Sequence, residues 1–116
     1  MIAGIYNILC EQGATFERTF TITNPDGTVY DLTGFSGRMH IRKDASATTY
    51  YFSLTTSNGH MEIFPQFGEI NIRMSATETA ANFTRDGYYD LEIFNADGVV
   101  YRVLKGAFKL DKEITR

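Results

Sequence analysis

Apolar and polar residues alternate along most of the chain, and a period of two is typical of strands with one buried face. In TFERTFTIT, the side chains of Phe16, Phe20 and Ile22 fall on one face, with Arg18 as the exception. Three further segments alternate in the same way and predict a buried set: Met39, Ile41, Ile70, Ile72, Met74, Tyr89, Leu91 and Ile93. The long segment VVYRVLKGAFKL carries Gly106 in its middle, where a bend or bulge is expected.

Together with IYNILC, YYFSL and GHMEIF, these segments predict seven or eight short strands in an antiparallel β-sandwich. The segment SATETAANF, residues 75–83, breaks the alternation. Ser75 and Glu78 have the spacing of a capping box, and the alanines that follow favour a helix. We therefore expect one all-β domain over residues 1–116, with one short helix near 75–83 that crosses between the sheets and is anchored by Phe83.

Two turns share the pattern Asn-x-Asp-Gly-x-Val-Tyr, at residues 24–30 and 95–101. Asp-Gly between alternating runs is a strong signal for a tight turn, because Gly accepts a positive φ. A calcium loop would need regularly spaced oxygen ligands and a closing Glu, and this pattern does not occur. We expect both turns to be architectural hairpin turns that precede a strand.

The composition of the chain limits which classes of partner are expected. The chain has 43% hydrophobic residues, a net charge of -3 and scattered basic residues, which does not favour a nucleic-acid partner. The N-terminal stretch has no charged leader, and Gly4 and Asn7 interrupt it, so neither a signal peptide nor a membrane span is expected. Cys10 is the one cysteine, which excludes an intramolecular disulfide; its apolar neighbours predict a buried, inert thiol.

No residue pattern points to catalysis, a cofactor or a metal. His40, His60, Asp44 and Glu62 lack the spacing of a metal site. Asp90 and Glu92 could serve as the acid and base of a hydrolase, but their alternation favours a solvated face paired with Arg102. The expectation is a protein that is not an enzyme.

The sequence gives more support to a binding role than to catalysis. A strand can bury only alternate members of the triplet Tyr50, Tyr51 and Phe52, so at least one aromatic ring must face outward. Phe64 and Phe67 flank a second stretch of apolar surface. We expect apolar contacts with a partner at Tyr50, Tyr51, Phe64 and Phe67, and a basic face that meets an acidic partner at Arg38, His40 and Arg42.

Three segments, EQGATFERTFTITNPDGTVYDLTGFSGRMHIRKD, GEINIRMSATETAANF and GYYDLEIFNADGVVYRVLKGAFKL, resemble in order a family of small tailed-bacteriophage virion proteins. With LTTSNGHMEI and the closing EITR, the resemblance extends from about Cys10 to Arg116. D-L-T-G, S-A-T-E-T-A and G-x-Y-D-L-E are its most specific parts.

The resemblance implies an immunoglobulin-like sandwich in the virion, assembled in the cytoplasm of a bacterial host. It implies a non-enzymatic tail or baseplate adaptor that forms homo-oligomers and docks to other virion proteins. A capsid decoration protein and a neck component stay open. The alternative from another class is a carbohydrate- or receptor-binding module, with aromatic side chains as platforms for a host-surface glycan.

Overall fold

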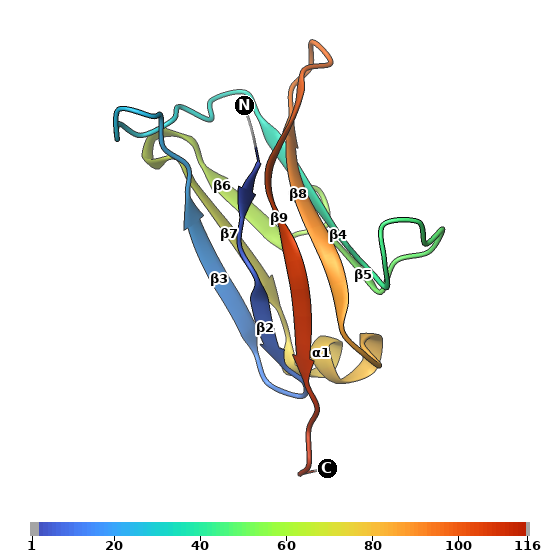
Figure 1. Ribbon diagram of the computed structural model, residues 1–116. Helices are drawn as coiled ribbons and strands as arrows, with labels where there is room; N and C mark the ends of the chain where they lie inside the picture. The colour runs from blue at the N-terminus through green and yellow to red at the C-terminus, as the bar shows by residue number, and fades with distance from the viewer. Residues whose placement is uncertain (1–2, 116) are drawn as a thin grey trace.

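The computed structural model describes residues 3–115 as two β-sheets packed face to face (Figure 1). The larger sheet has the strand order β1-β9-β8-β4-β5, and β2 also pairs with β9; the smaller sheet has the order β3-β7-β6. The elements are β1 (Gly4–Ile5), β2 (Ile8–Glu11), β3 (Phe16–Thr21), β4 (Ser36–Arg42), β5 (Phe52–Thr55), β6 (Met61–Phe64), the 3-10 turn η1 (Pro65–Phe67), β7 (Glu69–Met74), α1 (Ala76–Asn82), β8 (Gly87–Phe94) and β9 (Val100–Asp111).

The predicted all-β class is confirmed, and the strand order is that of an immunoglobulin-type sandwich. In that nomenclature β4, β8 and β9 take the places of strands C, F and G, and β3, β7 and β6 those of B, E and D. The expectation of a purely antiparallel sandwich needs one correction. The N-terminal strands β1 and β2 run parallel to β9.

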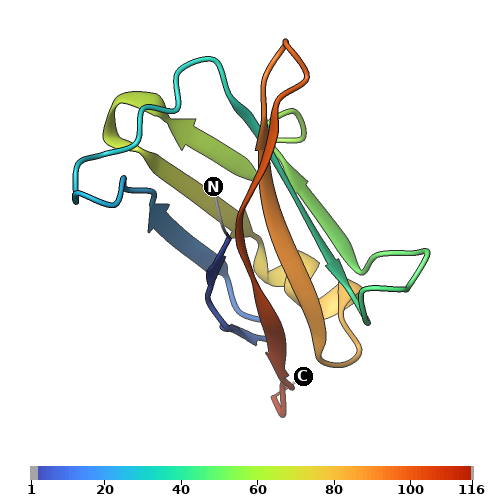
Figure 2. The ribbon, with the colours of Figure 1, turned by 45° about the horizontal axis from the view of Figure 1, so that its top comes forward.

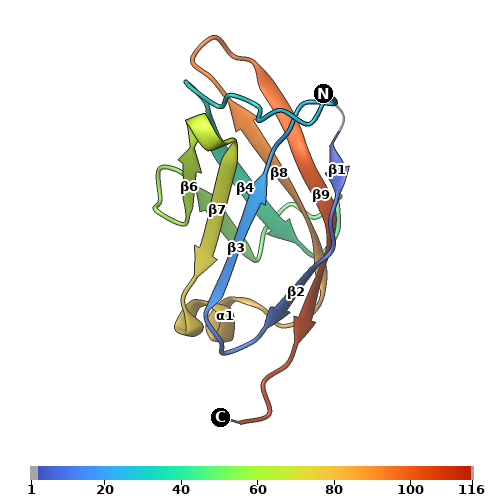
Figure 3. The ribbon, with the colours of Figure 1, turned by 90° about the vertical axis from the view of Figure 1, so that its left-hand side faces the viewer.

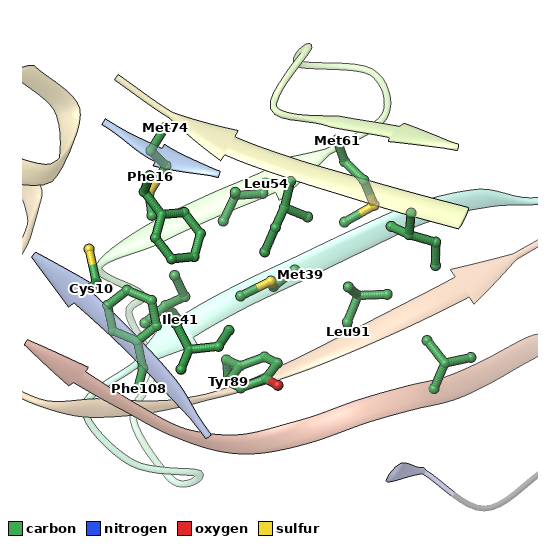
Figure 4. Close-up of a cluster of buried hydrophobic side chains, with 14 of the residues drawn as sticks. Cys10, Phe16, Met39, Ile41, Leu54, Met61, Met74, Tyr89, Leu91 and Phe108 are labelled. Atoms are coloured by element: carbon green, nitrogen blue, oxygen red, sulfur yellow. The ribbon is translucent and has the colours of Figure 1, made fainter. Parts of the chain in front are cut away.

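The core lies between the sheets and is built from alternate residues of each strand (Figure 4). All eight side chains that the alternation assigned to the interior are buried. Aromatic rings close the core at the helix end, where Phe83 stacks on Phe108 with ring centroids 5.1 Å apart. The ring of Phe16 lies 6.2 Å from that of Phe108, so rings from β3, from β9 and from the residue that follows α1 meet.

The helix α1 carries the chain from β7 of the smaller sheet to β8 of the larger one. It begins with the predicted capping box, in which the Ser75 side chain accepts a hydrogen bond from the Glu78 amide and Glu78 accepts one from the Ser75 amide. Within the helix, Thr79 is fully buried, and its Oγ1 donates a hydrogen bond to the Ala14 carbonyl at 2.8 Å. No helix among the described residues is long and apolar enough to cross a membrane.

Both Asn-x-Asp-Gly segments form tight turns with the same hydrogen bonds. In each, the Asn amide donates to the carbonyl of the residue four positions on, and the Gly amide donates to the Asn carbonyl. The glycines have φ values of 88° and 84°, as their turn role requires. The second turn joins β8 to β9, whereas the first is flanked by one isolated bridge, Thr23 to Val29. The strand expected after the first turn is therefore absent in the described chain, and Leu32 is buried from an irregular segment instead.

Gly106 does not form the predicted bulge. The register between β8 and β9 shifts where Leu91 faces Leu104 and Glu92 faces Arg102, which leaves Val103 as the extra residue. At Gly106 the backbone of the N-terminal segment lies against β9, and a Cβ atom there would overlap the carbonyl oxygen of Tyr6.

We expect Gly106→Ala to displace the N-terminal strands and to lower the free energy of unfolding by about 1–3 kcal/mol, as overpacking does. Urea unfolding of the purified protein measures this directly. Gly4→Ala is the matched control on β1, because its Cβ would lie 3.5 Å from the nearest atom, in ordinary van der Waals contact. Equal stability of Gly106→Ala and the unsubstituted protein would contradict the close approach.

Candidate functional site

Nine polar and aromatic side chains gather on the outer face of the larger sheet. Because Met39 and Ile41 point inward from β4, the residues that alternate with them, Arg38, His40 and Arg42, point outward. The strand register continues this outer face onto β8 and β9. We call this surface the basic face; it consists of Arg38, His40, Arg42, Tyr50, Tyr88, Asp90, Glu92, Arg102 and Lys105.

Two ion pairs hold four of the six charged side chains of the basic face. Arg38 Nε lies 2.9 Å from Glu92 Oε1, and Arg102 Nε lies 3.3 Å from Asp90 Oδ2. The predicted pairing of the two carboxylates with Arg102 is thus confirmed for Asp90, while Glu92 pairs across the other neighbouring strand. Both pairs are partly exposed, so each contributes roughly 0–1 kcal/mol to stability and mainly orients its side chains.

Among the nine residues of the basic face, four cations stand beside two carboxylates, which gives them an excess of two positive charges. Asp44, in the loop after β4, lines a pocket with Arg42 and Arg102 and brings one further negative charge next to this face. The excess lies on Arg42 and Lys105, neither of which has a carboxylate within 4.0 Å in the part of the chain that the structure describes.

The ring of Tyr50 stacks on His40 with centroids 4.6 Å apart, and the Arg42 guanidinium lies 5.6 Å from the same tyrosine ring. Arg42 Nη2 is 3.1 Å from His40 Nδ1. A guanidinium can only donate, so Nδ1 accepts and the imidazole is neutral, with its proton on Nε2. Burial, and after it the charge of Arg42, lowers the pKa of His40, which agrees with this assignment. Tyr50 nevertheless remains 51% exposed.

Tyr88, which alternates with the buried Tyr89 and was not among the contact residues expected from the sequence, is 57% exposed. A pocket of about 500 Å³ opens beside it and reaches the N-terminal strand, where Ile5 is 77% exposed. Polar side chains that line it include those of Asn7, Asp90, Arg102 and Lys105. The signal that could have found this site was the parity of Tyr88 with Asp90; the approach of Ile5 depends on the parallel pairing, which no local pattern encodes.

The structure separates the other aromatic candidates from the basic face. Tyr51 is partly buried against the core, with its ring 6.0 Å from Phe83 in an edge contact. Phe64 points outward from β6 of the smaller sheet, and Phe67, 64% exposed, follows it in η1. These two line a pocket of about 350 Å³ with Thr33 and the residues between them. Figure 2 shows η1 beside the loop at 22–34, and the Leu32 amide donates to the Pro65 carbonyl there at 3.1 Å.

The outer face of the smaller sheet has the opposite charge. We call it the acidic face; it consists of Glu17, Glu62, Phe64, Glu69 and Arg73. Three carboxylates stand beside one cation, which leaves an excess of two negative charges. Arg73 Nη2 approaches Glu62 Oε1 at 3.9 Å, so the excess lies on Glu17 and Glu69.

Two more carboxylates lie in the 22–34 loop beside η1. Hydrogen bonds from the side chain and amide of Thr28 lower the pKa of Asp26, and those from Thr33 lower the pKa of Asp31. Both are therefore ionised at neutral pH and add negative charge to this loop.

A third cleft, of about 340 Å³, lies between the start of β3, the 56–60 loop and the start of α1. His60 Nε2 is 2.6 Å from Glu78 Oε2 there, while Glu78 Oε1 accepts the Ser75 amide at 2.8 Å. Glu78 is thus occupied by the helix cap. Within residues 3–115, no group of three or more His, Cys, Asp or Glu side chains is placed to hold a metal ion.

Cys10 lies in the core, fully buried as predicted. Burial raises the pKa of its thiol to about 11, so the group is protonated at neutral pH and a poor nucleophile.

The chain matches no protein-family model and no curated protein. Its function must therefore be inferred from its own surfaces and from the resemblance of its segments.

We expect the stability of the fold to depend on pH through the capping carboxylate of Glu78. The hydrogen bond from the Ser75 amide is the main cause that lowers the pKa of Glu78 below 4.5 in the folded protein. A carboxylate whose pKa is lower in the folded than in the unfolded state stabilises the fold at pH values above its unfolded-state pKa. That stabilisation is lost as the pH falls through the folded-state pKa. We expect Glu78→Gln to be less stable than the unsubstituted protein by about 0.5–1 kcal/mol at neutral pH, with the difference shrinking below about pH 4.

Urea unfolding at both pH values measures that difference. Glu62→Gln is the matched control: its carboxylate lies 3.9 Å from Arg73, and it accepts no backbone amide within the described residues 3–115. A Glu78→Gln deficit that stays constant from neutral to acid pH would refute the assignment.

Proposed function

We propose that this protein is a non-enzymatic structural component of a tailed-bacteriophage virion, in the tail or baseplate, assembled in the cytoplasm of the bacterial host. It acts as an adaptor that associates with copies of itself and docks to other virion proteins. The resemblance of its segments to small phage virion proteins supports the proposal, and the sandwich agrees with the fold that the resemblance implies.

The observation that carries the proposal is the basic face. Tyr50 and Tyr88 are large and exposed; Tyr88 belongs to β8 and Tyr50 stacks on His40 of β4. Such rings among ordered arginines are typical of binding hot spots. The ion pairs of Arg38 and Arg102 reduce the freedom that a docking partner would otherwise have to restrict. A surface built in this way favours recognition of a macromolecule.

The engagement of the reactive side chains supports a role without catalysis. Asp90 and Glu92 are each paired with an arginine, and Glu78 caps a helix while it holds His60. Cys10 is a protonated core thiol. A capsid decoration or neck role would use the same docking surfaces, so the position within the virion needs a separate binding assay against purified tail and capsid assemblies.

Native mass spectrometry over a concentration series tests self-association. We expect discrete oligomers that persist on dilution, and we expect the double variant Tyr50→Ser/Tyr88→Ser to dissociate at a concentration at least about tenfold higher, as the loss of about 1.4 kcal/mol requires. Ile114→Ser is the control, because it removes an exposed apolar side chain that lies outside both sheet faces. A protein that stays monomeric at about 100 μM would contradict the self-association.

The pocket beside Tyr88 also favours a second candidate function, the binding of a bacterial surface glycan. An exposed tyrosine with Asn7, Asp90 and Arg102 around it offers a stacking platform and hydrogen-bonding groups for a sugar ring. We expect any glycan binding on an array to be lost in Tyr88→Ser and kept in Phe67→Ser, whose side chain lies in another pocket. A flat array response removes this candidate and leaves the adaptor proposal unaffected.

A further inference from the structure

The seven contact residues expected from the sequence do not form one surface. Arg38, His40, Arg42 and Tyr50 share the outer face of the larger sheet, whereas Phe64 points outward from the smaller sheet on the other side of the core. Figure 3 shows the two sheets one behind the other, so their outer faces point in opposite directions. A two-fold symmetric dimer would use one patch twice, while a head-to-tail contact needs two different patches on one molecule.

The two faces are complementary in charge. The basic face has an excess of two positive charges on Arg42 and Lys105, and the acidic face an excess of two negative charges on Glu17 and Glu69. Contact between two basic faces would place like charges together, which is costly in an interface, whereas contact between a basic and an acidic face joins opposite charges.

Each face also carries an apolar anchor. Tyr88 and the 500 Å³ pocket beside it lie on the basic face, and Phe64 lies at one end of the acidic face, next to the more exposed Phe67. Apolar anchors within a charged surround are the usual composition of a protein interface, where a few rings supply most of the binding energy.

We infer that the basic face of one copy docks on the acidic face of a second copy of this chain. The inference rests on the proposed self-association and specifies its geometry. Because each copy keeps one free face of each kind after a contact forms, the association repeats, and it closes into a ring or grows as a filament according to the rotation per step. Salt weakens it, because unpaired surface charges contribute the attraction.

Charge reversal on each face tests the inference. Arg42→Glu/Lys105→Glu changes the basic face from an excess of two positive to two negative charges, and Glu17→Lys/Glu69→Lys makes the opposite change on the acidic face. We expect each double variant to weaken self-association at least about tenfold. The quadruple variant, in which both faces are reversed and complementary again, should recover most of the loss.

Two controls keep the result interpretable. Arg85→Glu and Asp97→Lys reverse charges of the same signs at exposed positions outside both faces, in the loop before β8 and in the turn before β9, and should leave association unchanged. Circular dichroism on heating checks that every variant is folded, and recovery in the quadruple variant excludes misfolding as the cause of the loss.

Sedimentation velocity over a concentration series measures the association of all variants, and each result has a distinct meaning. Loss in both double variants with recovery in the quadruple variant supports the inference. Loss in the basic-face variant alone overturns it in favour of a two-fold contact or an acidic partner of another kind. No loss in either variant, while the unsubstituted protein still oligomerises, overturns the inference and leaves the proposed adaptor function standing. A monomeric unsubstituted protein at low salt overturns both.

Discussion

The packing of two sheets through a single layer of apolar side chains is the constraint on which the rest of this structure depends. Met39 and Leu91 of the larger sheet belong to the same core cluster as Ile70 and Ile72 of the smaller one, and all four are almost fully buried. Because a strand alternates, fixing these residues inward fixes their neighbours outward, at regular spacing and on rigid backbone. The basic and acidic faces are therefore consequences of the core, and a slip of one residue in a strand such as β4 or β7 would disrupt both the core and the outer face to which that strand contributes.

The N-terminal segment completes the core and joins it to the surface. Cys10 is buried, the Tyr89 hydroxyl donates to the Tyr6 carbonyl at 2.6 Å, and Gly106 leaves room for that approach. The same segment places Ile5 at the rim of the pocket beside Tyr88. Burial raises the pKa of Tyr89 well above 10, so its hydroxyl stays a neutral donor. The hydrogen bond from Tyr89 to Tyr6 links the N-terminal segment to β8 in the larger sheet.

Much of this architecture could be predicted from local pattern. Alternation located the strands and their buried residues, the Ser75–Glu78 spacing located the helix, and Asp-Gly located two turns, because each of these signals acts within a few residues. The parallel pairing of the N-terminal strands and the bulge at Val103 escaped prediction, since they arise from contacts between distant parts of the chain. The candidate contacts were identified by type, but their division between two faces depends on which sheet each strand joins.

That division is the basis of the proposed self-association. In the proposed assembly, opposite charge excesses on the two faces let copies of the sandwich bind one another in one direction, and many weak contacts of this kind add up in a symmetric assembly. The most direct test is to mix the Arg42→Glu/Lys105→Glu and Glu17→Lys/Glu69→Lys variants and to determine the composition of any complexes by native mass spectrometry. Each variant alone has two faces of like charge, so the account predicts monomers when they are apart and assemblies with equal numbers of both when they are mixed. An equimolar mixture that remains two separate monomers, while the unsubstituted protein oligomerises, would contradict it.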